Sequence, residues 1–189
     1  MQPVQLTDRL RRLDPDDENG LSALVDEITQ EDRRDARSAV QIWASDDPAM
    51  SRKALVLLSG VHDLAVVPLL ESRGPHSPEK EAWLLTTIAE AQIELRGEVV
   101  RRIDLSLADR RPVPLPDAYQ GSTMEETPPP RRVCDEAYAL MRRLTRPGEN
   151  EEQYQAKVRA FLQLGDRQKD AEIKQEKNGS VWKRLTEEE

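Results

Sequence analysis

The sequence predicts an all-α fold in which short helices pair into hairpins that stack on one another. Apolar residues recur at the three-to-four spacing of a helix along most of the chain. Prolines and glycines divide this pattern into short segments. No run of alternating apolar and polar residues is long enough to indicate a sheet.

The composition is typical of a folded domain with an acidic surface. The chain has 189 residues, of which 37% are hydrophobic and 34% charged, and its formal net charge is −8. This length corresponds to about one domain, so we predict a single repeat domain over residues 1–189. No apolar run approaches the roughly 18 residues that a membrane helix needs. We expect a cytoplasmic protein, although a chain whose export signal had been removed would look the same.

The N-terminal part predicts one helix near Leu6–Leu13 and then an irregular first hairpin. Each helix of this hairpin has one apolar face. The residues of the two faces are Leu21, Leu24, Val25 and Ile28, followed by Ala36, Ala39, Val40 and Trp43. Their spacing is that of amphipathic helices.

Two segments headed by proline repeat one layout thirty residues apart. A helix is expected over 48–60, after two aspartates that can cap it. The next apolar segment, 64–70, contains Pro68, which would kink a helix or restrict it to a late first turn. A further helix is expected to begin at Pro78, and its partner covers 99–107. A period of 30 residues lies in the range of stacked helical hairpins.

Residues 109–130 interrupt this array with a long proline-rich loop. The interval holds six of the thirteen prolines, and repeated proline rings prevent a continuous helix. A loop of this length is either functional or disordered. We leave open whether it docks on the helices through its apolar side chains or is a mobile insertion. The candidate anchors are Val113, Leu115, Tyr119 and Met124.

The C-terminal third predicts a last hairpin and a charged tail. The hairpin comprises a helix over Arg131–Arg146 and a second apolar set from Tyr154 to Leu162. Residues 165–189 form a charged helix and tail, in which pairs such as Asp166 with Lys169 indicate a solvated surface. The segment around Trp182 is expected to fold back over the last hairpin as a polar end cover. The predicted fold is therefore an α-solenoid of about four hairpins.

The stretch from Asp46 to Phe161 resembles HEAT-like repeat proteins of the bacterial type. Residues 47–58 are similar to the HEAT pattern of a proline, a basic residue, an alanine and two leucines. The opening of the last hairpin, 131–141, is similar to a Val-Cys-Asp-Glu-Ala run that follows a variable loop in such proteins. The resemblance implies an α-solenoid and a protein-binding role, with no catalytic residues and no cofactor.

The candidates for catalysis are few. His62 and His76 both fall in expected turns, where histidines are usually solvated or capping groups, and they lack the spacing of a zinc site. Cys134 lies in a first helical turn behind two arginines, which would lower the pKa of a thiol. The acidic residues that follow it oppose ionisation, so we interpret Cys134 as a packing residue.

Other chemical motifs are absent or weak. The acidic segment 14–20 lacks the ordered ligands and the final glutamate of a calcium loop. The glycines form neither a phosphate-binding loop nor a nucleophile elbow. We therefore predict no catalytic, cofactor or metal site.

Arginines on neighbouring hairpins are the predicted contact residues for another protein or peptide. Arginine is enriched where interfaces concentrate their binding energy. With the 109–130 loop, the candidates are Arg101, Arg102, Arg142, Arg143 and Tyr119.

Two other functions remain open at this stage. HEAT-like repeats also build the alkylpurine DNA glycosylases, and an arginine-lined face with Trp43 or Trp83 exposed would bind nucleic acid. The other alternative is a small immunity-type protein with an acidic binding face, formed by Asp46, Asp47 and Glu71.

Overall fold

The computed structural model describes residues 3–14, 18–30, 33–72, 76–90, 96–115 and 129–187, and within these ranges the chain is all-α. Eleven helices and a two-residue strand pair make up the described structure. The chain divides into two compact units, 1–76 and 77–189. None of the described helices has the length and apolar character required to cross a membrane. The absence of a larger sheet among these residues agrees with the sequence prediction.

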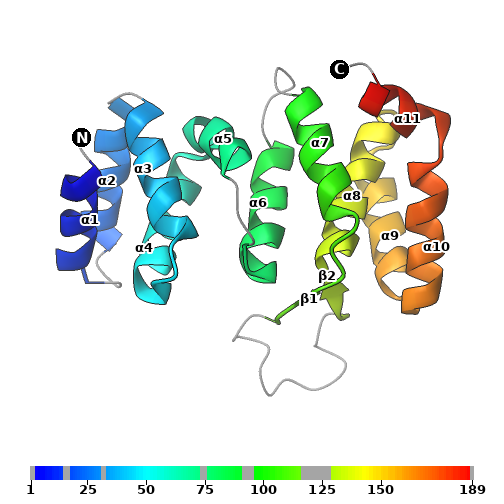
Figure 1. Ribbon diagram of the computed structural model, residues 1–189, viewed down its shortest axis with the longest axis horizontal. Coiled ribbons are helices and arrows are strands. Elements are labelled where there is room, and N and C mark those ends of the chain that lie inside the picture. Colours follow the sequence, from blue (N-terminus) through cyan, green and yellow to red (C-terminus); the bar gives the residue numbers. More distant parts are fainter. Residues whose placement is uncertain are drawn as a thin grey trace. The chain divides into compact units, whose positions relative to one another are not determined.

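The described part of unit 1 contains five helices, and α3 makes contacts with three of the others (Figure 1). They are α1 (Pro3–Arg12), α2 (Glu18–Gln30), α3 (Arg33–Ala44), α4 (Pro48–Gly60) and α5 (His62–Glu71). Helix α3 packs against α1, α4 and α5, while α2 packs against α4. Trp43 near the end of α3 is almost fully buried, which confirms its interpretation as a core residue.

Helix α4 begins and ends where the sequence predicts. The Asp47 carboxylate accepts hydrogen bonds from the backbone N–H groups of Ala49 and Met50, both at 3.1 Å. Pro48 occupies the first helical position, where a missing N–H has no cost. At the other end Gly60 lies against Val25 of α2, so close that an added Cβ would come within 2.8 Å of a methyl group. The start of α4 therefore follows from the Asp47 side chain and Pro48, and the absence of a side chain at Gly60 lets the end of α4 approach α2.

Removing the cap of α4 tests this assignment. We expect Asp47→Ala to lower the free energy of unfolding by about 1 kcal/mol, because two backbone donors lose their acceptor. Urea denaturation followed by circular dichroism measures the loss. Asp46→Ala is the matched control, since Asp46 is exposed and does not cap the helix. Equal losses in the two variants would contradict the assignment.

Helix α5 differs from the sequence prediction in two respects. It begins at His62, which the sequence had placed in a turn, and it runs three residues beyond Pro68 to Glu71. Pro68 is therefore past the first turn and close to the end of the helix. A proline at this position removes one helical hydrogen bond, the one that a backbone N–H at residue 68 would donate to the carbonyl of Leu64.

Unit 2 contains six helices and a short strand pair. The elements are α6 (Pro78–Glu90), α7 (Arg96–Ser106), β1 (Pro112–Val113), β2 (Arg131–Arg132), α8 (Val133–Thr145), α9 (Glu151–Leu162), α10 (Asp166–Lys177) and α11 (Ser180–Glu187). Helix α8 is central and packs against α6, α7, α9, α10 and α11. Its Tyr138 ring stacks on Phe161 of α9 with centroids 4.0 Å apart.

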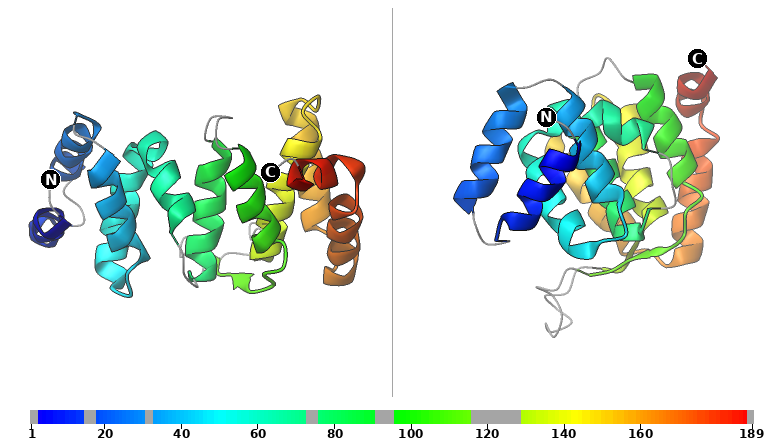
Figure 2. Two further views of the ribbon diagram at one scale, coloured as in Figure 1. Left: turned by 45° about the horizontal axis from the view of Figure 1, so that its top comes forward. Right: turned by 60° about the vertical axis from the view of Figure 1, so that its left-hand side comes forward.

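The strand pair brings together the two described ends of the proline-rich segment. Strands β1 and β2 are antiparallel, with Pro112 opposite Arg132 and Val113 opposite Arg131, and β1 lies against α6 (Figures 1 and 2). The predicted helix over 131–146 thus begins two residues later, at Val133. The Asp135 carboxylate accepts the backbone N–H of Arg132 at 3.0 Å and so stabilises this helix start.

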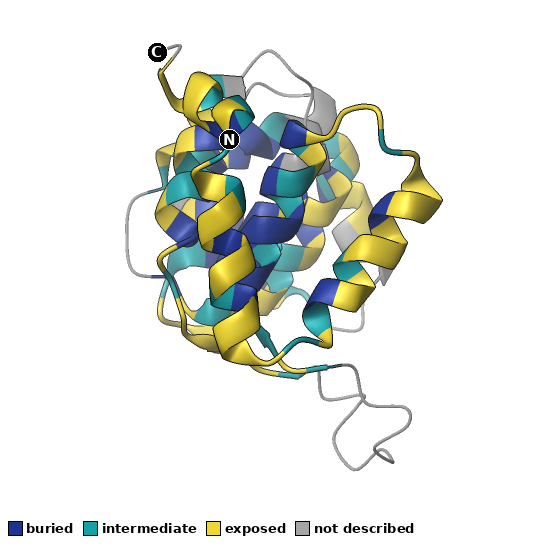
Figure 3. Cartoon of the chain, turned by 90° about the vertical axis from the view of Figure 1, so that its right-hand side faces the viewer, coloured by how far each residue is buried: buried dark blue, intermediate teal, exposed yellow. Residues whose placement is uncertain are grey.

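The C-terminal helix packs on one helix of the last hairpin and also on an earlier helix of unit 2. Trp182 of α11 is buried, and its indole N–H donates to Asp104 of α7 at 3.2 Å. Helix α11 contacts α7, α8 and α10, so the predicted cover of the last hairpin is found on α8 and extends to α7. Figure 3 shows that α9, the outer helix of that hairpin, is mainly exposed, with Tyr154 and Phe161 as its buried residues.

Candidate functional site

The predicted contact arginines of unit 2 form two pairs of neighbours in the sequence, 101–102 and 142–143. In each pair one side chain points into the unit and the other points outward. Arg102 on α7 donates from Nε and Nη2 to Glu81 of α6, at 3.0 and 2.6 Å. Ser106 donates to the same carboxylate at 2.8 Å. The Arg102 side chain is only 15% exposed, so it connects α6 to α7 inside the unit.

Arg142 on α8 is held in the same way. Its Nε and Nη2 donate to the two carboxylate oxygens of Glu149, in the turn after α8. Burial lowers the pKa of Arg142, but the hydrogen bonds and charge of Glu149 outweigh it and raise the pKa. Arg102 and Arg142 thus make bidentate bonds to carboxylates of their own chain.

The other members of the pairs face outward, because successive residues of a helix point about 100° apart. Arg101 is exposed on α7. Arg143 is half-exposed on α8, lies 4.3 Å from the centre of the Tyr154 ring, and donates from Nη2 to Glu151 at 3.2 Å. Tyr119, the remaining predicted contact residue, lies outside the described residues, as does Met124.

A groove on unit 2 places Arg143 beside apolar side chains. We call it the α8–α9 groove; its volume is about 290 Å³, and its lining includes Leu85, Arg131, Glu136, Leu140, Arg143 and Val158. Small-molecule sites usually occupy about 300–1,000 Å³. The groove is therefore at the small end of that range and suits a few side chains of a peptide better than a whole cofactor.

The charged groups of the α8–α9 groove differ in exposure. Arg131 is 41% exposed and Arg143 is 50% exposed, whereas Glu136 is 20% exposed and accepts from Arg131 Nη1 at 2.9 Å. Tyr154 forms part of the wall, and its hydroxyl donates to the carbonyl of Ala139 at 3.1 Å. Burial raises the pKa of Tyr154, so its hydroxyl stays protonated at neutral pH.

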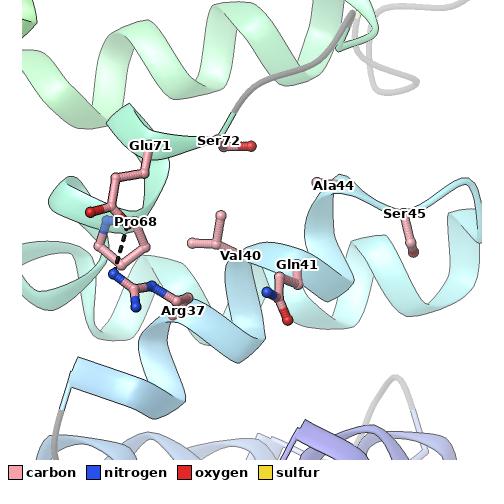
Figure 4. Close-up of a pocket in the computed structure, with 8 residues that line it drawn as sticks. All are labelled: Arg37, Val40, Gln41, Ala44, Ser45, Pro68, Glu71 and Ser72. Carbon is pink, nitrogen blue, oxygen red and sulfur yellow. Dashed lines mark hydrogen bonds and ion pairs between the residues drawn. The ribbon is translucent and has the colours of Figure 1, made fainter.

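Unit 1 has a second groove, between α3 and α5 (Figure 4). Its volume is about 380 Å³, with Val40 and Pro68 among its apolar residues. Arg37 donates to Glu71 at 2.7 Å across the two helices, and both side chains are more than half exposed. Because Glu71 pairs with Arg37 and Asp47 caps α4, two of the three acidic residues proposed for an immunity-type face have partners in unit 1.

A charge cluster that the sequence analysis did not predict connects α8 with β2 and α10. The Asp135 carboxylate is buried and accepts from Arg132 Nη2 at 2.9 Å and from Lys169 Nζ at 3.4 Å. Lys169 also donates to the carbonyl of Pro130 at 3.2 Å. Burial alone would raise the pKa of Asp135, but the hydrogen bonds of Arg132 and the charges of Arg132 and Lys169 lower it overall.

The expectation of a solvated Lys169 is therefore wrong. Lys169 is 3% exposed and pairs with Asp135 across the unit instead of with Asp166 on its own helix. The sequence did contain a signal, since Lys169 lies four residues before Ile173 and these two are the buried residues of α10. A cation on the apolar face of a polar helix indicates a buried partner.

The two candidate groups for covalent or acid–base chemistry that the structure describes are buried. Cys134 is fully buried, and burial together with the Asp135 charge raises the pKa of its thiol to about 11. The thiol is thus protonated at neutral pH, in agreement with a packing role. His76 is 6% exposed, not solvated as expected; its Nε2 lies 3.2 Å from Ser72 Oγ, and its ring contacts Trp43. The His62 side chain is outside the described part of the structure.

Within the described residues, no three His, Cys, Asp or Glu side chains come together as the ligands of a metal ion would. Comparison of the chain with protein-family models, with curated proteins and with solved structures found no match.

Proposed function

We propose that this chain is a non-enzymatic protein-binding module built of HEAT-like helical hairpins. Support for this architecture comes from helices that pack on the second helix along the chain. In unit 1, α1 packs on α3, α2 on α4, and α3 on α5; in unit 2, α6 packs on α8. Stacked hairpins produce this order of contacts, because equivalent helices of successive hairpins lie next to each other.

The observation that carries the proposal is the α8–α9 groove. Its lining combines two partly exposed arginines, Arg131 and Arg143, with apolar side chains such as Leu140 and Val158. Arginine and apolar anchors of this kind dominate the energetics of protein interfaces. The buried ionisable groups of unit 2, such as Asp135 and Lys169, form ion pairs with one another, so their role is to stabilise the fold.

The pairing of the arginines favours a protein partner over a nucleic acid. A phosphate-binding face needs several cations available to release counterions. In unit 2, carboxylates of the same chain contact Arg102, Arg110, Arg111, Arg132, Arg142 and Arg146, in addition to the one carboxylate that each groove arginine contacts. The proposed alkylpurine glycosylase alternative therefore has less support than peptide binding.

Site-specific photo-cross-linking tests the proposal. We expect benzoylphenylalanine in place of Leu140 to form an adduct with a protein of the source cell, because Leu140 lines the α8–α9 groove. Gel analysis before and after nuclease and protease treatment identifies the class of partner. The same label at Gln175, an exposed residue of α10 outside the groove, is the control and should give at least fivefold less adduct.

If the α8–α9 groove is the surface that binds the partner, formation of the adduct at position 140 should depend on Arg143. Arg143→Glu should abolish the adduct formed at position 140 while leaving the helical circular dichroism unchanged, since Arg143 is half-exposed. Adducts that are equal at positions 140 and 175, or that nuclease removes, would contradict a protein-binding groove.

A further inference from the structure

We infer that the α8–α9 groove binds an acidic amphipathic helix, with one carboxylate at each end of a stripe of small apolar residues. This inference rests on the proposed function and specifies the chemistry of its partner. The groove lies among α6, α8 and α9, and a helix laid between helices is a common mode of peptide recognition.

The charges at the groove favour an acidic partner. Its lining contains Arg131, Arg143 and Glu136, and the two arginines are at least twice as exposed as the glutamate. This positive lining contrasts with the net charge of −8 for the whole chain. The charges of this lining therefore attract an acidic ligand, although the chain as a whole is acidic.

The arginines at the groove have hydrogen-bonding capacity beyond their internal pairs. Arg131 contacts Glu136 through Nη1, and Arg143 contacts Glu151 through Nη2, one nitrogen in each case. Their inward neighbours Arg132 and Arg142 instead use two nitrogens on one carboxylate. Because a guanidinium carries five N–H donors, Arg131 and Arg143 can donate hydrogen bonds to a second carboxylate.

The spacing of the two arginines sets the length of the partner. Arg131 immediately precedes the N-cap of α8, and Arg143 lies in its last turn. At 1.5 Å per residue, the part of α8 between them is about 15 Å long, or close to three turns. A partner helix lying along α8 would thus place its carboxylates about eleven residues apart, because this spacing is three turns and puts both on the same face. The 290 Å³ groove has room for small apolar residues between them.

Glu151 competes with such a ligand for Arg143. Its carboxylate is 65% exposed and lies 3.2 Å from Nη2, and it also accepts from Gln155 at 2.8 Å. Exposed ion pairs of this type contribute little stability. Replacing Glu151 with glutamine should therefore release Arg143 for the partner without unfolding α9.

The probe is a set of fluorescent 15-residue helical peptides measured by anisotropy with the full chain. Glutamates occupy positions 3 and 14, and the groove-facing positions between them vary among Ala, Val and Leu. A matching set carries lysine at positions 3 and 14. The protein variants are Arg131→Gln, Arg143→Gln and Glu151→Gln, with Arg167→Gln as the control, because Arg167 is exposed on α10 outside the groove.

We expect the best glutamate peptide to bind at least tenfold more tightly than its lysine counterpart. Arg131→Gln and Arg143→Gln should each weaken it fivefold or more, and Glu151→Gln should tighten it two- to threefold, a gain that misfolding cannot produce. Arg167→Gln should leave it unchanged. The inference is overturned if neither set binds, if both sets bind equally, or if the groove variants behave like Arg167→Gln. If one of these results is found but the cross-linked adduct at position 140 still forms, the proposed protein-binding function stands and only the acidic helix is rejected. If no adduct forms at position 140, the proposed function itself is rejected.

Discussion

Asp135→Asn is expected to lower the free energy of unfolding by about 3–5 kcal/mol, because it leaves the buried Lys169 ammonium without its carboxylate and removes one of the carboxylates that pair with Arg132. Asp135 is the common partner of Arg132 and Lys169, and the Lys169 side chain is only 4% exposed. In the variant the Lys169 ammonium still donates a hydrogen bond to the carbonyl of Pro130, but this carbonyl carries no charge to balance that of the ammonium. Urea denaturation followed by circular dichroism measures the loss.

A double variant separates the charge effect from a loss of shape. Lys169→Met removes the stranded ammonium, so Asp135→Asn/Lys169→Met should recover a large part of the stability that Asp135→Asn loses. Asp170→Asn is the comparison within the same cluster: it removes a partly exposed carboxylate of α10 that lies 3.1 Å from Arg132 Nη1, and it should cost less than about 1 kcal/mol. A double variant no more stable than Asp135→Asn alone would contradict this account.

The same ion pair makes stability depend on pH. The pKa of Asp135 in the folded protein lies below its usual value of about 4, so its contribution is complete above pH 4. As the pH falls below 4 towards the folded pKa, protonation removes that contribution. Stability should thus decline in acid for the natural chain, and part of this decline should be missing from Asp135→Asn.

The helices could be predicted from the sequence because their determinants are local. In α4 the cap Asp47, the first-turn proline and the apolar spacing all lie within the helix or next to it, and the observed bounds match the prediction. The start of α8 was placed two residues early. Arg131 and Arg132 pair with a strand twenty residues earlier, and no local pattern reports that pairing.

The buried polar groups and the groove depend on contacts between distant residues. Lys169 lies 34 residues from Asp135, and its helix looked solvated because most of its other residues are charged or polar. His76 was expected to be a solvated or capping group because it falls in an expected turn, yet its ring packs on Trp43. The arginine pairs were correctly singled out as neighbours on helices. Which member faces Glu81 or Glu149 depends on helix packing and could not be read from the sequence.

Trp182→Ala is expected to cost about 3–5 kcal/mol of the free energy of unfolding of unit 2, since a large, almost fully buried side chain is removed. Its indole N–H also donates to Asp104, so the carboxylate loses a partner. Trp182→Phe keeps most of the apolar contact without the N–H and should cost clearly less. Chemical denaturation of both variants measures the difference.

Helix α11 has eight residues, which is too short to be stable by itself in water. If Trp182 is its anchor, the alanine variant undocks α11, and the loss cannot exceed the free energy with which α11 docks on α7 and α8. A chain ending at Asn178 removes the helix altogether, so it should unfold with the same free energy as Trp182→Ala, and hydrogen exchange should show α7 less protected in both. A truncated chain much less stable than Trp182→Ala would mean that other residues of α11 hold it in place, Leu185 being half-buried there. Lys177, which pairs with Asp104 at 2.9 Å, remains in both chains and so cannot explain such a difference.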